Sequence, residues 1–129
     1  MAVLIDSSVW IAAADASNPE CIKLKRLIQK NELICLIRPI QVEVCQGATN
    51  EEIFHQLWDG FLGFDFIEIT TKLWGLSAWN YFKCRKKGIT LSTLDCLIAT
   101  VAKESRLALW TLDKNIVRAR THIGFDLMT

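Results

Sequence analysis

Two acidic residues in this sequence come directly after apolar runs that are typical of strands. Asp6 follows Ala-Val-Leu-Ile, and Asp113 follows Ala-Leu-Trp-Thr-Leu. Ligands of open α/β sheets bind at the carboxyl ends of the strands, so both carboxylates are candidates for a binding site. Each residue alone would also suit the N-cap of a following helix, and that alternative stays open.

Two further acids stand among apolar neighbours. In a helix, Asp95 would share its apolar stripe with Leu91, Leu94, Ile98 and Ala102. An unpaired buried carboxylate costs several kcal/mol, so Asp95 needs either a cation site or an ion pair with a lysine or arginine. Glu43 lies between two valines and is the only charged residue in 40–49. An ordinary exposed helical glutamate is the alternative for Glu43.

The four acids together predict more than any one of them. If they converged within about 5 Å, each pair would repel by roughly 3 kcal/mol at an effective dielectric constant of about 20. Such a cluster persists only when protons or a cation neutralise it. Oxygen ligands without histidine or thiolate select Mg²⁺ or Mn²⁺, and such an ion can activate water and stabilise charge on a phosphate. The acids therefore predict metal-dependent phosphate chemistry, without identifying the phosphate.

Composition indicates an ordinary globular protein. The chain has 129 residues, 51% of them hydrophobic and 22% charged, with a formal net charge of +1. We expect a single domain over residues 1–129, no membrane partner and no signal peptide. The five cysteines form no CxxC pair, which favours reduced core cysteines and a cytoplasmic protein over a disulfide framework. Only two histidines are present, so a histidine-based metal site is not expected.

The elements that must position the acids alternate along the chain. Strands are predicted at 2–5, 32–37, 64–69, 106–112 and 125–128. Helices are predicted within 6–14, 18–30, 40–48, 50–61, 71–88, 91–105 and 113–120. This alternation predicts a three-layer α/β fold with a mainly parallel sheet flanked by helices.

The whole chain resembles the PIN-domain ribonucleases, most closely the VapC-type toxins of toxin–antitoxin pairs. The matching stretches are VLIDSSVWIA, IQVEVCQG, GITLSTLDCLIATVAKES and LALWTLDKNI, which carry the four acids in the family's order. The resemblance implies a PIN-like fold with about five strands and an acidic pocket at their carboxyl ends. It also implies a Mg²⁺- or Mn²⁺-dependent endoribonuclease that cleaves RNA through metal-activated water.

The resemblance assigns roles to individual residues. Three carboxylates are expected to bind the metal: Asp6, Asp95 and Asp113. Glu43 is a fourth acid that binds metal or orients the attacking water. Ser8, Thr111 and Asn115 are expected to contact the acids or the phosphate. Asn115 stands at a position near them where many relatives carry a further aspartate, which weakens the case for a second metal more than for the first.

Basic and aromatic residues suggest partners. Candidate contacts to the RNA substrate are Arg118, Arg120, Lys86 and Lys87. The alternative for the lysines is a solvated face that is favoured at a helix C-terminus. Core packing is the first expectation for Trp74 and Trp79, and a homodimer surface or an antitoxin groove is the second. The resemblance implies a cognate antitoxin and a homodimer.

The sequence leaves one other function open and argues against a second. A catalytically inactive PIN-like scaffold that binds RNA or protein without cutting remains the alternative. An aspartate-nucleophile phosphatase requires a second acid two positions after the first, and this chain has Ser8 there.

Overall fold

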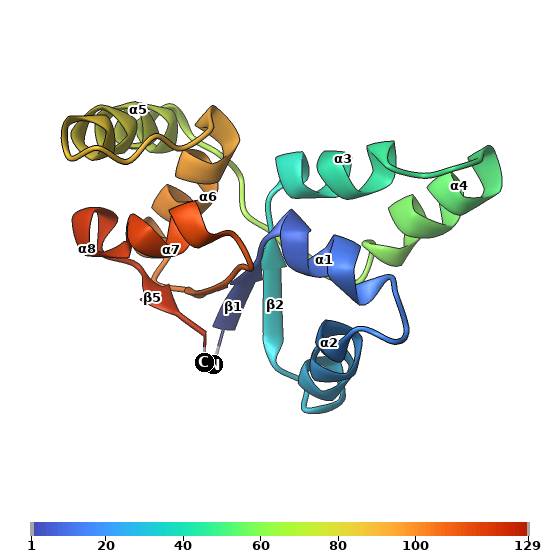
Figure 1. Cartoon of the computed structure of the whole chain (residues 1–129). Helices are drawn as coiled ribbons and strands as arrows, with labels where there is room; N and C mark the ends of the chain where they lie inside the picture. The colour runs from blue at the N-terminus through green and yellow to red at the C-terminus, as the bar shows by residue number, and fades with distance from the viewer. Residues whose placement is uncertain (1, 129) are drawn as a thin grey trace.

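The structure is a computed structural model, and it describes residues 2–128. A five-stranded parallel sheet runs through it in the order β3-β2-β1-β4-β5 (Figure 1). The strands are β1 (Ala2–Ile5), β2 (Leu33–Leu36), β3 (Asp65–Phe66), β4 (Ala108–Trp110) and β5 (Asp126–Leu127). This sheet with its flanking helices confirms the predicted three-layer α/β fold.

Helices connect the strands throughout the described chain. They are α1 (Ser7–Ala13), α2 (Pro19–Gln29), α3 (Arg38–Gln46), α4 (Glu51–Gly60), α5 (Thr71–Lys86), α6 (Thr93–Glu104), α7 (Lys114–Arg118) and α8 (Arg120–Ile123). Figure 1 shows α5 to α8 on one side of β1 and α1 to α4 on the other. Val9 of α1 packs with Val3 and Ile5, and Ile116 of α7 belongs to the core of Leu4, so the helices that follow β1 and β4 cover opposite faces of the sheet. The ends of these two strands meet where the N–H of Asp6 donates to the carbonyl of Trp110 at 2.9 Å.

The central strand explains why the sheet is covered on both faces. Val3 and Ile5 of β1 pack against Val9 and Leu24 of α1 and α2. Leu4, which points the other way, belongs to the larger core with α6. All three β1 side chains are fully buried, as expected of a parallel strand between two helical layers. The two layers fix where the end of β1 lies, and with it Asp6.

Some elements are shorter than predicted, for local reasons. The strand predicted at 64–69 is reduced to two residues, because it pairs at the sheet edge only with Cys35 and Leu36 before β2 ends. The strand predicted at 106–112 begins at Ala108, because Arg106 has a φ of 56° and Leu107 N–H donates to the carbonyl of Ala102. This left-handed residue ends α6 in a helix-terminating turn.

Helix α5 corrects the expectation for its tryptophans. Trp74 and Trp79 are 49% and 55% exposed, so core packing does not account for them. The helix contacts α6 through small and polar side chains, with Asn80 Nδ2 donating to Thr100 Oγ1 at 3.0 Å. Trp79 stacks on Phe82 at the exposed surface of α5, whereas Trp74 lines a cavity beside α6 with Thr93 and Cys96.

The five cysteines are free and buried, in keeping with the expected reduced core. Within residues 2–128, no helix combines the length and the apolar character that a bilayer crossing requires.

Candidate functional site

Asp6 is the centre of a hydrogen-bond network at the end of β1. Its carboxylate is 2% exposed and carries donors on both oxygens. Oδ1 accepts from the backbone N–H of Ser7 at 2.8 Å and Oδ2 from the Ser8 hydroxyl at 2.7 Å. Oδ2 also accepts from Thr111 Oγ1 at 2.9 Å. The N-cap alternative is therefore correct for Asp6, and it coexists with contacts that reach across the sheet.

The loop after β4 is tied to Asp6 by two hydroxyl groups. Thr111 Oγ1 donates to Asp6 and accepts from the N–H of Asp113 at 3.0 Å. Ser8 Oγ likewise accepts from the N–H of Leu112 at 3.1 Å. Asp113 Oδ1 caps α7 by accepting from the backbone at Asn115 (2.8 Å) and Ile116 (3.1 Å). The two strand-end acids thus belong to one connected network, with Thr111 between them.

Glu43 joins this network from α3. Its Oε1 accepts from the Ser7 hydroxyl at 2.9 Å, and the same hydroxyl lies 3.4 Å from Asp6 Oδ1. Ser7 therefore bridges two of the four acids. Ser7 was not among the site residues that the sequence predicted. The sign available in the sequence was the pair of serines directly after Asp6, which offers a hydroxyl to either side of the strand end.

Asp95 is coupled to the other three acids by charge. It is the third residue of α6 and half-buried, so it lies at the edge of the apolar stripe and is less enclosed than predicted. Its backbone N–H donates to Ser92 Oγ at 3.0 Å. Partial burial raises the pKa of the Asp95 carboxyl, the hydrogen bond with Ser92 opposes this, and the negative charges of Asp113, Asp6 and Glu43 raise it further.

The ion-pair alternative for Asp95 fails in the described chain. Within residues 2–128, none of the four acids forms an ion pair with a lysine or arginine. The raised pKa of Asp95 likewise has no cation among its causes. The four carboxylates therefore share a region without a protein counter-charge, which is the electrostatic condition that favours a bound cation.

The donor chemistry fits a hard divalent cation, although the side chains form no ready-made cage. The available donors are carboxylates flanked by serine and threonine hydroxyls, which suits Mg²⁺ or Mn²⁺. No group of three or more histidine, cysteine, aspartate or glutamate side chains within residues 2–128 already stands in a metal-holding arrangement. The protein's own donors hold Asp6 and Asp113, so a shared ion would require the carboxylates to reorient.

The remaining candidates divide into near and distant residues. Asn115 is exposed in the first turn of α7, one residue after the cation Lys114. Arg118 is exposed at the end of α7, whereas Arg120 Nε donates to the Phe125 carbonyl at 3.3 Å and so ties α8 to the segment before β5.

Lys86 and Lys87 lie at the far end of α5. They line a cavity with residues of α8, and none of the four acids lines it. Their expected contact with RNA is therefore not a contact at the acidic site itself.

Comparisons with known proteins agree with this geometry. Residues 3–121 match the family model described as the PIN domain. No curated protein matches the chain. Three similar solved structures are VapBC2 from Rickettsia felis bound to a promoter DNA fragment (TM-score 0.79, 19% identity, 99% of this chain and 98% of that chain), FitAcB from Neisseria gonorrhoeae (0.77, 16%, 98% and 96%) and the Sarcin-Ricin loop cleaving toxin VapC20 from Mycobacterium tuberculosis (0.74, 16%, 98% and 98%). At these identities the structural likeness establishes the fold.

Proposed function

The chain belongs to the PIN-domain family, and we propose that it is a Mg²⁺- or Mn²⁺-dependent endoribonuclease, the toxin of a toxin–antitoxin pair. The observation that carries the proposal is the connection among its acids. Thr111 and Ser7 link Asp6 to the neighbouring acidic segments, and Asp95 feels the charge of the other three acids. These groups gather at the carboxyl edge of a parallel sheet, where α/β folds bind ligands.

Each acid has a distinct proposed task. Asp6, Asp95 and Asp113 would hold the ion, and Glu43 would hold it or orient the attacking water. Bound there, the ion would activate water and neutralise charge developing on the phosphodiester. Ser8 and Thr111 fix the rotamer of Asp6 through their hydrogen bonds to Oδ2. Such outer partners keep the ligand oriented, which is why their loss typically weakens metal binding or activity.

RNA is the proposed substrate on the strength of the family and of one similar structure. VapC20 of Mycobacterium tuberculosis is described as a toxin that cleaves the Sarcin-Ricin loop. We carry over from it only the class of reaction, cleavage of an RNA phosphodiester. The identity of the RNA that this chain cuts is a question for mapping the products.

An RNA pool offered to the purified protein with Mn²⁺, with Mg²⁺ and with EDTA tests the proposal. Cleavage is expected with either metal, none with EDTA, and none by Asp95→Asn. Asp126→Asn is the matched control, because Asp126 is an exposed carboxylate on β5 outside the network. Equal cleavage by Asp95→Asn and by the control would refute the assignment of the acids.

The alternative of a non-cutting scaffold predicts a different thermal response. A ligand that binds only the folded state stabilises it by about 2.7 kcal/mol at 100 times its Kd, so a metal site should raise the melting temperature. A scaffold without a metal site would show no such rise and no cleavage. Asp113→Asn should abolish a metal-linked rise, because it removes one proposed ligand.

The antitoxin is proposed to occupy the apolar groove between α1, α3 and α4. This groove has a volume of about 370 Å³ and is lined by Trp10, Val44, Ile53 and Leu57, with Glu43 in its wall. Helix α4 buries none of its residues, and Phe54 and Trp58 are 37% and 38% exposed. An antitoxin segment seated there would cover apolar surface and also one of the four acids, which gives a route to inhibition.

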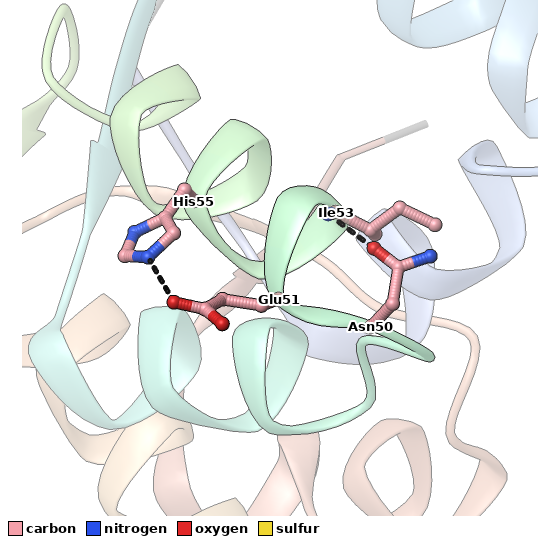
Figure 2. A network of polar contacts seen from close by, with 4 residues as sticks. All are labelled: Asn50, Glu51, Ile53 and His55. Atoms are coloured by element: carbon pink, nitrogen blue, oxygen red, sulfur yellow. Dashed lines mark hydrogen bonds and ion pairs between the residues drawn. The ribbon is translucent and has the colours of Figure 1, made fainter.

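Helix α4 is fixed at its start despite this exposure. Asn50 Oδ1 accepts from the N–H of Ile53 at 2.9 Å, and Glu51 Oε1 lies 3.7 Å from His55 Nε2. Figure 2 shows both contacts. The cap defines the beginning of the helix, and the i,i+4 pair follows the first turn. The groove wall is thus a formed helix whose apolar side chains are available before a partner binds.

A further inference from the structure

Two aromatic rings stack on the outer face of α5. The rings of Trp79 and Phe82 have centroids 5.6 Å apart and an interplanar angle of 18°. Both side chains are exposed, Trp79 by 55% and Phe82 by 40%. Lys86 Nζ stands 5.2 Å from the centre of the Phe82 ring. An exposed aromatic surface with a cation at its edge is unusual for a face that only meets water.

Phe82 also forms part of a basic cavity between α5 and α8. The cavity measures about 380 Å³ and is lined by Phe82, Lys83, Lys86, Lys87, Thr121 and His122. None of the described residues that line it is acidic. Within residues 2–128, none of its three lysines is paired with a carboxylate. The clustered positive charges thus repel one another, and an anion bound among them would relieve that repulsion.

The cavity is connected to the acidic site by α7 and α8. Asp113 caps α7, and Thr121 of the cavity lies eight residues later on α8, so the two residues are at most about 28 Å apart. Lys114 and Arg118 are exposed cations along that path. A nucleic acid strand advances about 3.4 Å per nucleotide when stacked, so about eight nucleotides would cover even that upper bound. One strand can therefore reach both places.

We propose that the Trp79–Phe82 stack and the adjoining lysine cavity form a docking site for single-stranded RNA, in which bases stack on the rings and a backbone phosphate enters the cavity. This inference rests on the proposed function, since it gives the substrate strand a second anchor away from the cut. Bases of any identity can stack on an aromatic ring, and lysines contact phosphates without reading sequence. The site would increase affinity and fix the direction of the strand, leaving sequence choice to residues near the acids.

Charge favours RNA over a second copy of this chain as the occupant. A two-fold interface centred on this face would bring the same patch of both copies together, and with it two sets of three lysines. Such a dimer interface would increase the repulsion among the lysines, whereas an RNA phosphate would neutralise their charge. The other basic helix, α2, has exposed Lys25 and ends at exposed Lys30, and within residues 2–128 neither of these lysines lies over an aromatic ring. It therefore supplies a matched control of equal charge.

The test is binding of a fluorescein-labelled 12-nucleotide RNA without secondary structure, measured by anisotropy in EDTA. All variants carry Asp95→Asn so that no strand is cut. Lys86→Gln with Lys87→Gln should weaken binding and lower the salt slope by about 1.4, because single strands give about 0.7 per phosphate contact. Lys25→Gln with Lys30→Gln should leave both quantities unchanged. Thermal melts check that each variant remains folded.

The aromatic part has its own variant. Trp79→Leu should reduce RNA affinity roughly 5- to 100-fold, because a base loses its stacking partner. The salt slope should not change, because the substitution removes no charge. Equal binding and equal salt slopes for the α5 variants and the α2 control would overturn the inference. So would a sedimentation result in which Trp79→Leu turns a dimer into a monomer while RNA binding is untouched.

The outcomes separate this inference from the proposed function. Specific loss of binding in the α5 variants supports the docking site even if the unmodified chain cuts no RNA in any metal. Normal cleavage of long RNA by the Lys86→Gln and Lys87→Gln variant, together with unchanged binding, refutes the docking site and leaves the nuclease proposal standing.

Discussion

Thr111 offers a direct test of how the acidic network is held together. Its hydroxyl donates to Asp6 Oδ2 at 2.9 Å and accepts from the N–H of Asp113 at 3.0 Å. Thr111→Val keeps the shape of the side chain and removes both hydrogen bonds. Thr111→Ser keeps the hydroxyl and removes one methyl group. The pair of variants thus separates the hydrogen bonds from the packing.

The expected cost of Thr111→Val is about 2 kcal/mol of unfolding free energy. A hydrogen bond to a charged acceptor contributes about 1.5–3 kcal/mol, and the lower part of that range applies because Ser8 remains on the same oxygen. The N–H of Asp113 adds little because water can reach this half-buried residue. With an unfolding entropy of about 2.1 cal/mol/K per residue, the melting temperature should fall by about 7 °C.

Calorimetry and metal titration measure the two consequences. Thr111→Val should melt about 7 °C lower and bind Mn²⁺ roughly 10- to 100-fold more weakly, because an oriented ligand has lost its partner. Thr111→Ser should stay close to the unmodified protein in both. If Thr111→Val melted within 1 °C of the unmodified protein, or if both variants lost the same stability, the hydroxyl would not be what links the two strands.

Three further predictions concern the same site and its partner. Asp95→Asn should be at least as stable as the unmodified protein at neutral pH without metal. The pKa of Asp95 is raised in the folded state, so folding stability decreases as the pH rises through that pKa and the carboxyl ionises. The difference should vanish in acid, where Asp95 is protonated, and a loss of stability at neutral pH would contradict this reasoning. Ser7→Ala should cost about 1 kcal/mol in urea unfolding and reduce cleavage, since Glu43 loses its hydroxyl donor, whereas an exposed control, Ser17→Ala, should leave cleavage unchanged. Ile53→Glu should abolish capture of a co-expressed antitoxin without reducing RNA cleavage, because it places a charge in the apolar groove; undiminished capture would place the antitoxin elsewhere.

The homodimer implied by the family stays a prediction. Sedimentation equilibrium over a range of protein concentrations would decide it, and a mass equal to one chain throughout would refute it. In a homodimer, the inferred RNA site on α5 would be accessible only if the interface between the subunits lies elsewhere. The two measurements should therefore be made on the same samples.

The sequence correctly predicted the features that depend only on neighbouring residues. The apolar run before Asp6 forms β1 at its predicted bounds, and Asn18 with Pro19 starts α2 as predicted. Gly88, with a φ of 82°, follows the end of α5, where a residue without a Cβ is favoured. Capping and strand periodicity depend on neighbours in the chain, so the sequence contains them.

The length of the edge strand and the exposure of several side chains depend on residues that are distant in the sequence. The predicted strand at 64–69 contracts to two residues because β2 offers no more edge to pair with. Trp79 is exposed because α6 packs against small and polar residues of α5, and nothing in the α5 sequence says which face its neighbour will use. Asp95 is only half-buried because the apolar stripe of its helix is exposed at its first turn.

The sequence by itself determined the α/β fold and the four acids, since each acid is marked by the apolar residues beside it. Only the tertiary structure decided how they are joined. The Ser7 bridge to Glu43 and the Thr111 bridge to Asp6 span 36 and 105 residues of chain. It also decided that Lys86 and Lys87 gather with α8 instead of with the acids. Hydrogen bonds and charge clusters of this kind depend on distances in space, and chain packing alone sets those distances.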